Sequence, residues 1–427
     1  MSRIVRDPSG LPLAPSLSTT ARFDPTSIPV WVVSDGGVYS EWLSRSTAEA
    51  REAAGVATSL RRRPDRDTAL AAVTDVNAPL RQAYVDVMSA LTMWKTVTAE
   101  QLAAFTGRPS ITNRSNAVMD TLWDADLVIR GRHPPGSEVP VFYRRASGDA
   151  FGEFLGRLTY AERLAAFGGI KADWQRHYER HDIVTAELAL RIAEHCPVTG
   201  VLGEPVASAT HVFGPDITIH QGKTADMLVL RRDGLVILVE TTASFPSRSA
   251  QIQKVAKWLD LMAADRTRST ALVFVAIGEA KRGNDAGIAS QLRGLVPDAL
   301  WGHFEAQRMG IADRVAVVAW RDWFPEPGQV SPGFLALRAQ RPRLGVSPDD
   351  TVWEDVDLLD PFAVTSDVDL SAAKARHRFV RWYRPTPYWL RSRTESYDWK
   401  TPILVDSFGQ EVSEQLIGRF RRYDTAT

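Results

Sequence analysis

Two carboxylates near the middle of the chain are placed where they could hold one divalent cation between them. Asp226 directly precedes the apolar run 227–230, and Glu240 directly follows the apolar run 235–239. The segment between the runs, residues 231–234, ends in Asp-Gly. An Asp-Gly pair between two apolar runs is a strong signal for a β-hairpin. The sequence therefore predicts a hairpin with one carboxylate at the outer end of each strand.

The length of the hairpin loop decides whether the two acids can meet. A two-residue loop would place Asp226 opposite Thr241 and turn Glu240 to the other face, because successive side chains of a strand point to opposite faces. A three-residue loop with Gly234 in the left-handed position shifts the pairing by one residue. Asp226 then lies directly opposite Glu240, with Cβ atoms roughly 4.5–5.5 Å apart. We predict this second register, because glycine suits the left-handed position.

Two adjacent carboxylates on a buried hairpin repel each other and resist removal from water. A hard cation such as Mg²⁺, or Mn²⁺ in its place, relieves both problems because it prefers oxygen ligands. This hypothesis makes Asp226 and Glu240 the metal ligands. The alternative interpretation is that both acids simply end apolar strands at the boundary with solvent.

Composition sets the general class of the protein. A chain of 427 residues with 44% hydrophobic residues has room for about two or three domains with real cores. The formal net charge is zero, so any binding of nucleic acid must use local patches. The single cysteine, Cys196, excludes a disulfide framework within the chain and a CxxC zinc site. No apolar run approaches the ~18 residues of a membrane span. We expect a soluble cytoplasmic protein that does not enter membranes.

Residues 79–148 have the element order of a winged helix-turn-helix, which is three helices followed by a β-hairpin. Apolar residues recur at helical spacing from Leu80 to Trp94. A second helix is expected to begin after Thr98, with Gln101 in the capping-box position. A third is expected from about Ser110, before two strands around a Pro/Gly-rich loop.

The third helix of such a fold would enter the major groove and present its first residues to DNA. Polar side chains in this helix and arginines on or beside the predicted wing could contact base edges or phosphates. These candidate DNA-binding residues are Thr112, Asn113, Arg114, Asn116, Arg130, Arg132 and Arg144. The alternative is a winged helix that docks a protein, but the polar and basic face favours nucleic acid.

Residues 181–325 predict a mixed α/β layer with the two acids on its central hairpin. This order of elements resembles the PD-(D/E)xK nuclease core, in which a helix supplies a Glu, the second strand an Asp and the third strand Glu-x-Lys. Together with the preceding winged helix, the motifs ADMLVLRRDG, LVETTAS and KVAKW are similar to the replication-relaxation family of actinobacterial plasmids and phages. The resemblance covers about residues 80–280 and implies a role with plasmid or phage DNA.

The resemblance implies catalytic roles for Asp226 as the strand-two acid and Glu240 as the strand-three acid. Thr242 occupies the position of the catalytic lysine, two residues after the glutamate. A cation near the scissile phosphate is needed to orient the attacking water and offset developing charge. Lys254, on the helix after the hairpin, is the candidate replacement that could reach over the site, although most lysines on a helix are solvated. Lys257 is a weaker candidate, and Lys223 could approach from the strand entrance.

The acid supplied by the first helix has two candidates. Glu187 lies one turn inside the predicted helix that follows His181, as the nuclease core would require. Glu204, from the segment before the hairpin, is the alternative. His181 could bind phosphate, but a capping or packing role is the simpler interpretation of a lone histidine.

The remaining regions are an N-terminal segment (1–78), linking helices (149–180) and an irregular C-terminal region (326–427). The C-terminal region contains an acidic block from Asp349 to Asp369 and then a basic and aromatic block from Lys374 to Lys400. Arginines alternating with aromatic residues suit single-stranded nucleic acid. The alternatives are that the two blocks pair with each other or that the aromatic residues dock on the body. A homodimer or a protein partner could also use this region.

Two functions from different classes follow from these patterns. The first is a metal-dependent DNA endonuclease of a mobile element, in which the winged helix positions duplex DNA and Asp226 and Glu240 hold Mg²⁺. The second is a non-catalytic DNA-binding or scaffold protein with a degenerate nuclease fold. Thr242 favours the second, whereas Asp226, Glu240 and Lys254 favour the first.

Overall fold

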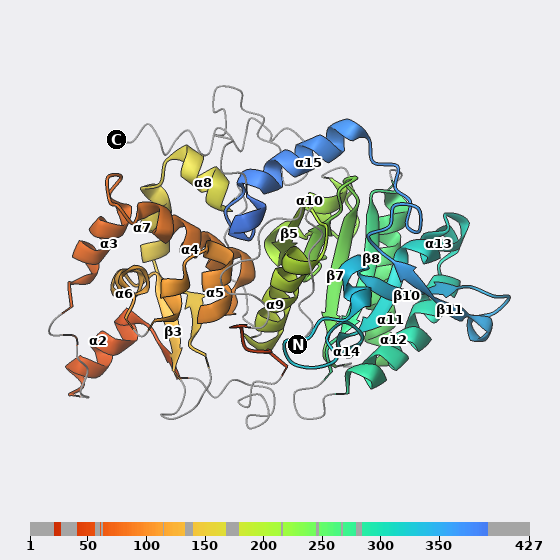
Figure 1. The fold of residues 1–427 in the computed structure, drawn as a ribbon, viewed down its shortest axis with the longest axis horizontal. Helices are drawn as coiled ribbons and strands as arrows, with labels where there is room; N and C mark the ends of the chain where they lie inside the picture. Colours follow the sequence, from red (N-terminus) through yellow and green to blue (C-terminus); the bar gives the residue numbers. More distant parts are fainter. Residues whose placement is uncertain are drawn as a thin grey trace.

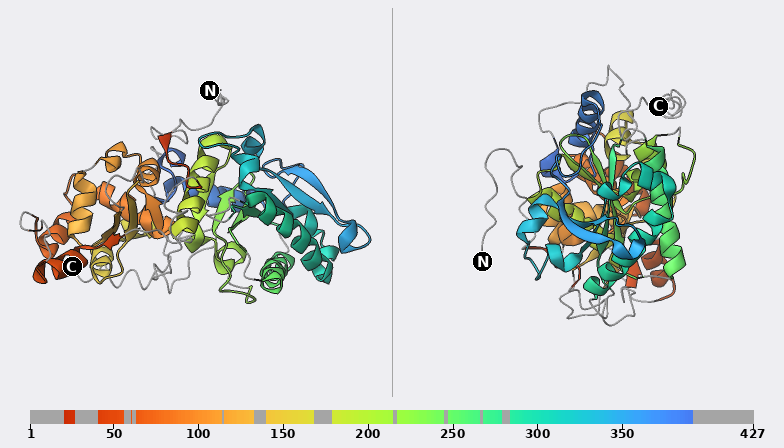
Figure 2. Two further views of the ribbon diagram at one scale, coloured as in Figure 1. Left: turned by 90° about the horizontal axis from the view of Figure 1, so that it is seen from below. Right: turned by 90° about the vertical axis from the view of Figure 1, so that its right-hand side faces the viewer.

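The computed structural model describes residues 21–26, 41–55, 60, 63–113, 115–132, 140–167, 179–214, 217–244, 247–265, 268–278 and 284–391. Within these ranges the fold is mixed α and β, with one four-stranded and one seven-stranded sheet (Figure 1). The two sheets lie in opposite halves of an elongated molecule, with helix α9 (Glu179–His195) packed between them (Figure 2). No helix among the described residues is long and apolar enough to cross a membrane.

The N-terminal half packs helices around the smaller sheet. Its strands form the order β1-β3-β4-β2, with every neighbouring pair antiparallel. The strands are β1 (Glu41–Leu43), β2 (Thr96–Thr98), β3 (Val128–Arg132) and β4 (Phe142–Arg145). The helices are α2 (Arg45–Ala53), α3 (Arg66–Thr74), α4 (Arg81–Trp94), α5 (Ala99–Thr106), α6 (Ala117–Asp124), α7 (Ala150–Gly156) and α8 (Tyr160–Phe167).

Local capping signals set the helix starts in this half. Thr98 and Gln101 form the predicted capping box at the start of α5. The next helix, α6, begins seven residues later than the expected start at Ser110, because the side chain of Asn116 caps its first turn by accepting from the amide of Met119 at 3.1 Å. Residues Pro109–Thr112 form a separate 3₁₀ turn. The prediction of one helix starting near Ser110 was therefore wrong at its N-terminal end.

The seven-stranded sheet forms the centre of the C-terminal half, in the order β11-β10-β9-β8-β7-β6-β5. Its middle strands β7, β8 and β9 run parallel, and the other neighbouring pairs are antiparallel. The strands are β5 (Gly200–Gly203), β6 (Met227–Leu230), β7 (Val236–Thr242), β8 (Thr270–Ala276), β9 (Val315–Ala319), β10 (Arg338–Arg343) and β11 (Val352–Asp357). Every residue of β5 to β9 is buried, because helices cover both faces of this part of the sheet.

Helices cover both faces of this sheet. Thr241 contacts Thr185 of α9, whereas its neighbour Glu240 contacts Trp258 of α11 (Arg248–Ala264). Successive residues of a strand point to opposite faces, so α9 and α11 lie on opposite sides of β7. The other helices of this half are α10 (Ala209–Phe213), α12 (Asp285–Trp301), α13 (Phe304–Arg308), α14 (Trp320–Trp323) and α15 (Leu370–Trp382).

The C-terminal region is more regular than expected. Residues of the acidic block form β11 and pair with arginines of β10, as Glu354 does with Arg341 at 2.6 Å, rather than with the basic block. Helix α15 docks on the body through the buried side chains of Phe379 and Tyr383, and Arg376 donates to the carbonyl of Gly234 at 2.6 Å. The prediction of an irregular region was wrong here because these contacts come from residues far apart in the sequence. The end of the basic block, including Lys400, lies outside the described residues.

A buried ion-pair network ties the N-terminal segment to helix α9. Arg22 contacts Glu187 at 3.0 Å and Glu194 at 2.8 Å, and Arg191 contacts Glu187 at 2.9 Å and Asp24 at 2.9 Å. The side chains of Arg22, Glu187 and Arg191 are fully buried. Burial alone would raise the pKa of Glu187, but the two arginines lower it to about 2. Glu187 therefore holds the fold together at this point.

We predict that Glu187→Gln destabilises the protein by about 3–5 kcal/mol near neutral pH, because it leaves buried arginine charges without their partner. The folded-state pKa of Glu187 lies below its unfolded value of 4.5, so its contribution is complete above pH 4.5 and is lost as the pH falls toward about 2. Urea denaturation over this pH range measures the difference. Glu49→Gln, at a half-exposed ion pair with Arg45, is the control and should cost less than about 1 kcal/mol. An equal cost at both sites would contradict the prediction.

Candidate functional site

The central hairpin has the register that a three-residue loop requires. Met227 pairs with Val239, so Asp226 and Glu240 come opposite each other one step further along the ladder. The amide of Arg231 donates to the carbonyl of Leu235 at 2.9 Å and closes a loop of residues 232–234. Gly234 has φ +91°, the left-handed conformation that favours glycine. The predicted register is confirmed.

The side chain of Asp226 continues the hydrogen bonding between β6 and β7 beyond the start of β6. Strand β6 begins at Met227, and beyond it the amide of Thr241 donates to Oδ2 of Asp226 at 2.6 Å instead of to a backbone carbonyl. The same oxygen accepts from the Thr241 hydroxyl at 2.9 Å and lies 3.2 Å from Nε2 of His181. Among the described residues, the hydrogen bonds of this carboxylate are made by Oδ2, so Oδ1 remains available to a ligand.

Charge pairing shifts the pKa values of both members of this pair. Burial alone would raise the pKa of Asp226, but the charge of His181, their hydrogen bond and Lys254 hold it well below its usual range. Burial alone would lower the pKa of His181, but the carboxylates of Asp226 and then Asp182 raise it to about 9. His181 is therefore protonated at neutral pH.

Glu240 is almost completely buried and is surrounded by cationic and polar donors. Its Oε1 accepts from Nζ of Lys223 at 2.6 Å and from Nε1 of Trp258 at 2.6 Å, and its Oε2 lies 2.5 Å from Nζ of Lys254. The Lys223 ammonium also lies 4.7 Å from the centre of the Trp258 ring. Lys223 and Lys254 thus supply the positive charge that we expected from a metal ion.

Lys254 links the two carboxylates. Burial would lower the pKa of Lys254, but Glu240 and then Asp226 raise it above its usual value. Lys257, one turn away on the same helix, is exposed to solvent. Thr242, at the position of the lysine in the nuclease core, keeps its hydroxyl buried without a hydrogen-bond partner among the described residues. Of the three candidate lysines, Lys254 and Lys223 reach Glu240 and Lys257 does not.

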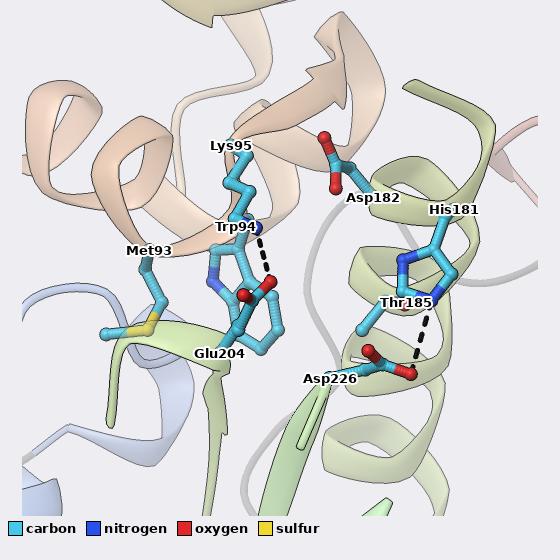
Figure 3. Close-up of a pocket in the computed structure, with 8 residues that line it drawn as sticks. All are labelled: Met93, Trp94, Lys95, His181, Asp182, Thr185, Glu204 and Asp226. Carbon is cyan, nitrogen blue, oxygen red and sulfur yellow. Dashed lines mark hydrogen bonds and ion pairs between the residues drawn. The ribbon is translucent and has the colours of Figure 1, made fainter. Parts of the chain in front are cut away.

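A small pocket opens beside Asp226 and is lined by residues from both halves of the molecule (Figure 3). Its lining residues are Met93, Trp94, Lys95, His181, Asp182, Thr185, Glu204 and Asp226. Figure 3 shows Lys95 and Glu204 paired on one side and His181 and Asp226 paired on the other. Burial raises the pKa of Asp182 to about 7, and Lys95 and His181 oppose this rise.

The structure separates the two candidates for the helix acid. Glu187 belongs to the ion-pair network with Arg22 and Arg191 and is not among the residues around Asp226 and Glu240. Glu204 lies in the pocket that contains Asp226, on the 3₁₀ turn that follows β5. Lys95 and Asp182 could not be found from local patterns, because Lys95 meets Glu204 and Asp182 meets Thr96 across a long stretch of chain.

Several predicted DNA-binding residues make internal contacts. Arg130 pairs with Asp120 at 2.9 Å, and the guanidinium of Arg144 lies 4.0 Å from the centre of the Trp42 ring. Asn116 caps α6. Arg114 and the side chain of Arg132 lie outside the described residues. The exposed members of the predicted set are Thr112 and Asn113, in the turn before α6.

The outer face of α6 is covered by the N-terminal segment. The guanidinium groups of Arg45, Arg63 and Arg130 lie 5.9, 5.0 and 5.8 Å from the centre of the Trp123 ring. Arg63 also contacts Asp124 at 3.0 Å. Trp123 is only 5% exposed, so this face of the helix is closed to a ligand in the observed conformation.

The carboxylates at the hairpin are the kind of oxygen donor that a hard divalent cation prefers. The described residues contain no group of three or more His, Cys, Asp and Glu that could hold a metal ion. Asp226 and Glu240 supply carboxylate oxygens from opposite positions of the hairpin, and Oδ1 of Asp226 makes no hydrogen bond to another described residue. Mg²⁺ often binds through one or two carboxylates and keeps several waters. Asp226 therefore offers an oxygen to such an ion, whereas Glu240 can bind the ion only by giving up one of its partners Lys223, Trp258 and Lys254.

Comparisons of the sequence with protein-family models and with curated proteins, and of the fold with solved structures, give no match.

We predict that His181→Gln destabilises the protein in a pH-dependent way. Because the folded-state pKa of His181 is about 9 against a usual 6.5, its contribution is complete below pH 6.5 and is lost as the pH rises through about 9. Denaturant titrations of wild type and variant across this range measure the difference in unfolding free energy, which should narrow at high pH. A difference independent of pH would show that the ion pair with Asp226 does not contribute to stability.

Proposed function

We propose that the protein is a metal-dependent phosphodiester hydrolase that acts on DNA, with its catalytic groups at Asp226, Glu240 and Lys254. The observation that carries this proposal is the position of the Lys254 ammonium, which lies 2.5 Å from Glu240 and interacts electrostatically with both carboxylates. Two acids and a lysine are the charged groups that the PD-(D/E)xK core requires. Here the lysine comes from helix α11 rather than from the strand.

The order of elements supports the same proposal. Helix α9 precedes the antiparallel strands β5, β6 and β7, and α11 then leads to β8, which is parallel to β7. Asp226 directly precedes the second of these strands, and Glu240 lies on the third. These are the positions that the PD-(D/E)xK core gives to its two acids. This order supports the proposal that residues 181–325 form a PD-(D/E)xK-like domain.

In the proposed reaction the residues of the chain bind and orient the phosphate. Asp226 and Glu240 would hold Mg²⁺, which when bound polarises the phosphoryl group and lowers the pKa of water. Lys254 offsets the negative charge that develops on the phosphate oxygens. Protonated His181 adds a second positive charge beside Asp226. Lys223 also contacts Glu240, so Lys223, Lys254 and His181 are three basic groups around the carboxylates of Asp226 and Glu240. This excess of positive charge attracts an anionic phosphodiester.

We also propose that residues 79–148 form a winged helix that positions duplex DNA. Strand β2 lies between α4 and α5, α6 follows, and β3 and β4 form the antiparallel pair that would carry the wing. Thr112 and Asn113 are exposed in front of α6, where they can meet a groove or a phosphate. Because the side chains of Arg130 and Arg144 stack on tryptophans, we expect the first DNA contacts at the turn that contains Thr112 and Asn113. The resemblance to the replication-relaxation family extends the proposal to plasmid or phage DNA.

A second function is a DNA-binding scaffold that does not cut. One observation favours it: both oxygens of Glu240 are already engaged by Lys223, Trp258 and Lys254. A metal ion must compete with these donors for the carboxylate. A closed charge cluster of this kind would stabilise the domain without taking part in catalysis.

We predict that Asp226→Asn, Glu240→Gln and Lys254→Met each reduce cleavage of supercoiled plasmid with Mg²⁺ or Mn²⁺ by about 10²–10³-fold, because each removes a charge from the site. The matched control is Lys257→Met, on the same helix but exposed, which should cleave like wild type. Nicking is quantified by gel electrophoresis. If the wild type binds DNA but cuts with neither metal, the scaffold function stands and the hydrolase proposal fails.

We predict that Asn113→Ala weakens binding of duplex DNA by about tenfold, the effect of one lost base or phosphate contact of ~1–3 kcal/mol, without lowering stability. The comparison variant is Asn116→Ala, which removes a helix cap and should lower the unfolding free energy by about 1 kcal/mol. Fluorescence anisotropy at two salt concentrations and thermal denaturation measure the two effects. DNA affinity that is unchanged by Asn113→Ala, or independent of salt, would contradict a winged helix that binds DNA.

A further inference from the structure

The junction between α4 and β2 touches both sides of the pocket beside Asp226. Lys95, which ends α4, forms an ion pair with Glu204, on the turn after β5. Thr96, the first residue of β2, makes a side-chain hydrogen bond to Asp182, the neighbour of His181. One short segment of the N-terminal half thus reaches the two elements that hold the candidate site.

Glu204 is connected to the site strand by a short backbone pairing. The amide of Ala225 donates to the carbonyl of Ala207 at 3.0 Å, and the amide of Ala209 donates to the carbonyl of Lys223 at 2.7 Å. Residues 207–209 therefore run beside residues 223–225, a segment that begins with Lys223 and directly precedes Asp226. A movement of the Glu204 turn must shift the segment that carries both side chains.

The backbone at Lys95 is strained. Lys95 has φ 62° and ψ −83°, a conformation that residues with a side chain rarely adopt and that costs on the order of 1–3 kcal/mol. Its side chain is 10% exposed. Such strain persists only where surrounding contacts impose it. Here the imposed conformation directs the ammonium group toward Glu204 (Figure 3).

The end of α4 also packs directly on the end of β5. The amide of Gly203 donates to Sδ of Met93 at 3.1 Å, two residues before Lys95. The contact surface between the halves therefore runs continuously from Met93 to Thr96. Displacement of α4 is passed to the Glu204 turn by direct contact.

We infer that the Lys95–Glu204 ion pair couples the DNA-binding half of the protein to the catalytic site, with Lys95 and Glu204 acting as positioning residues for Asp226 and Lys223. The inference rests on the proposed function. Binding of DNA to the N-terminal half moves or steadies α4, and the ion pair carries this change to the segment 207–226. The pocket has room for only about one water molecule, so a small displacement is enough to open or close it.

The test uses full-length protein with Lys95→Gly, Lys95→Arg and Glu204→Gln, together with Arg66→Ala as the control. Glycine tolerates the positive φ at position 95, so Lys95→Gly removes the ammonium group without adding strain. Arg66 forms a half-exposed ion pair with Glu153 inside the N-terminal half, away from the pocket. Hydrogen–deuterium exchange of segment 207–226 is measured with and without a short DNA duplex, and plasmid cleavage gives kcat and KM.

We expect DNA to change the exchange of segment 207–226 in wild type and Arg66→Ala but not in Lys95→Gly or Glu204→Gln. We also expect these two variants to lose about tenfold in kcat while DNA affinity stays unchanged, and Lys95→Arg to restore both readouts. Equal responses of wild type and Lys95→Gly, or a loss of DNA affinity parallel to the loss of kcat, would overturn the inference. If wild type shows the exchange response but never cuts, the coupling stands and the hydrolase proposal alone fails.

Discussion

The charge of Glu240 is the constraint on which the candidate site depends. A carboxylate that is 1% exposed is unstable unless hydrogen-bond donors and positive charges surround it. Lys223 comes from the segment before the hairpin, and Lys254 and Trp258 come from the helix after it. One buried acid thus fixes three segments relative to each other. Hydrophobic residues often fill such a position with equal or greater stability. The proposed function would account for these charges, which stability alone does not require.

The halves of the molecule meet where this site lies. Helix α9 contributes His181 to Asp226 and Glu187 to the buried network with Arg22. The same helix therefore lines the candidate site at one end and attaches the N-terminal segment further along. The pocket beside Asp226 is closed on one side by Lys95 of the N-terminal half. A site made by both halves can respond to what either half binds.

Local patterns predicted the parts of the fold that local interactions decide. Gly234 indicated the three-residue loop and with it the register, and Thr98 with Gln101 indicated the start of α5. The approach of Lys254 to the acids could be predicted because Lys254 lies on the helix that directly follows the hairpin. The places of Glu187 and Lys95 could not be predicted, since their partners Arg22 and Glu204 lie 165 and 109 residues away. The packing of α15 and the stacking of Arg63 on Trp123 could not be predicted either, because they also join residues far apart in the sequence.

The most direct test of the central claim is diffraction from crystals soaked in Mn²⁺, with data collected for anomalous scattering. If Asp226 and Glu240 form a cation site with Lys254 beside it, an anomalous peak will lie between the two carboxylates. Asp226 and Glu240 would then be the residues that hold the ion, and Lys254 or Lys223 would be displaced from the glutamate. An undisturbed cluster with no peak at saturating Mn²⁺ would contradict the account, because the lysines would then be permanent partners of Glu240.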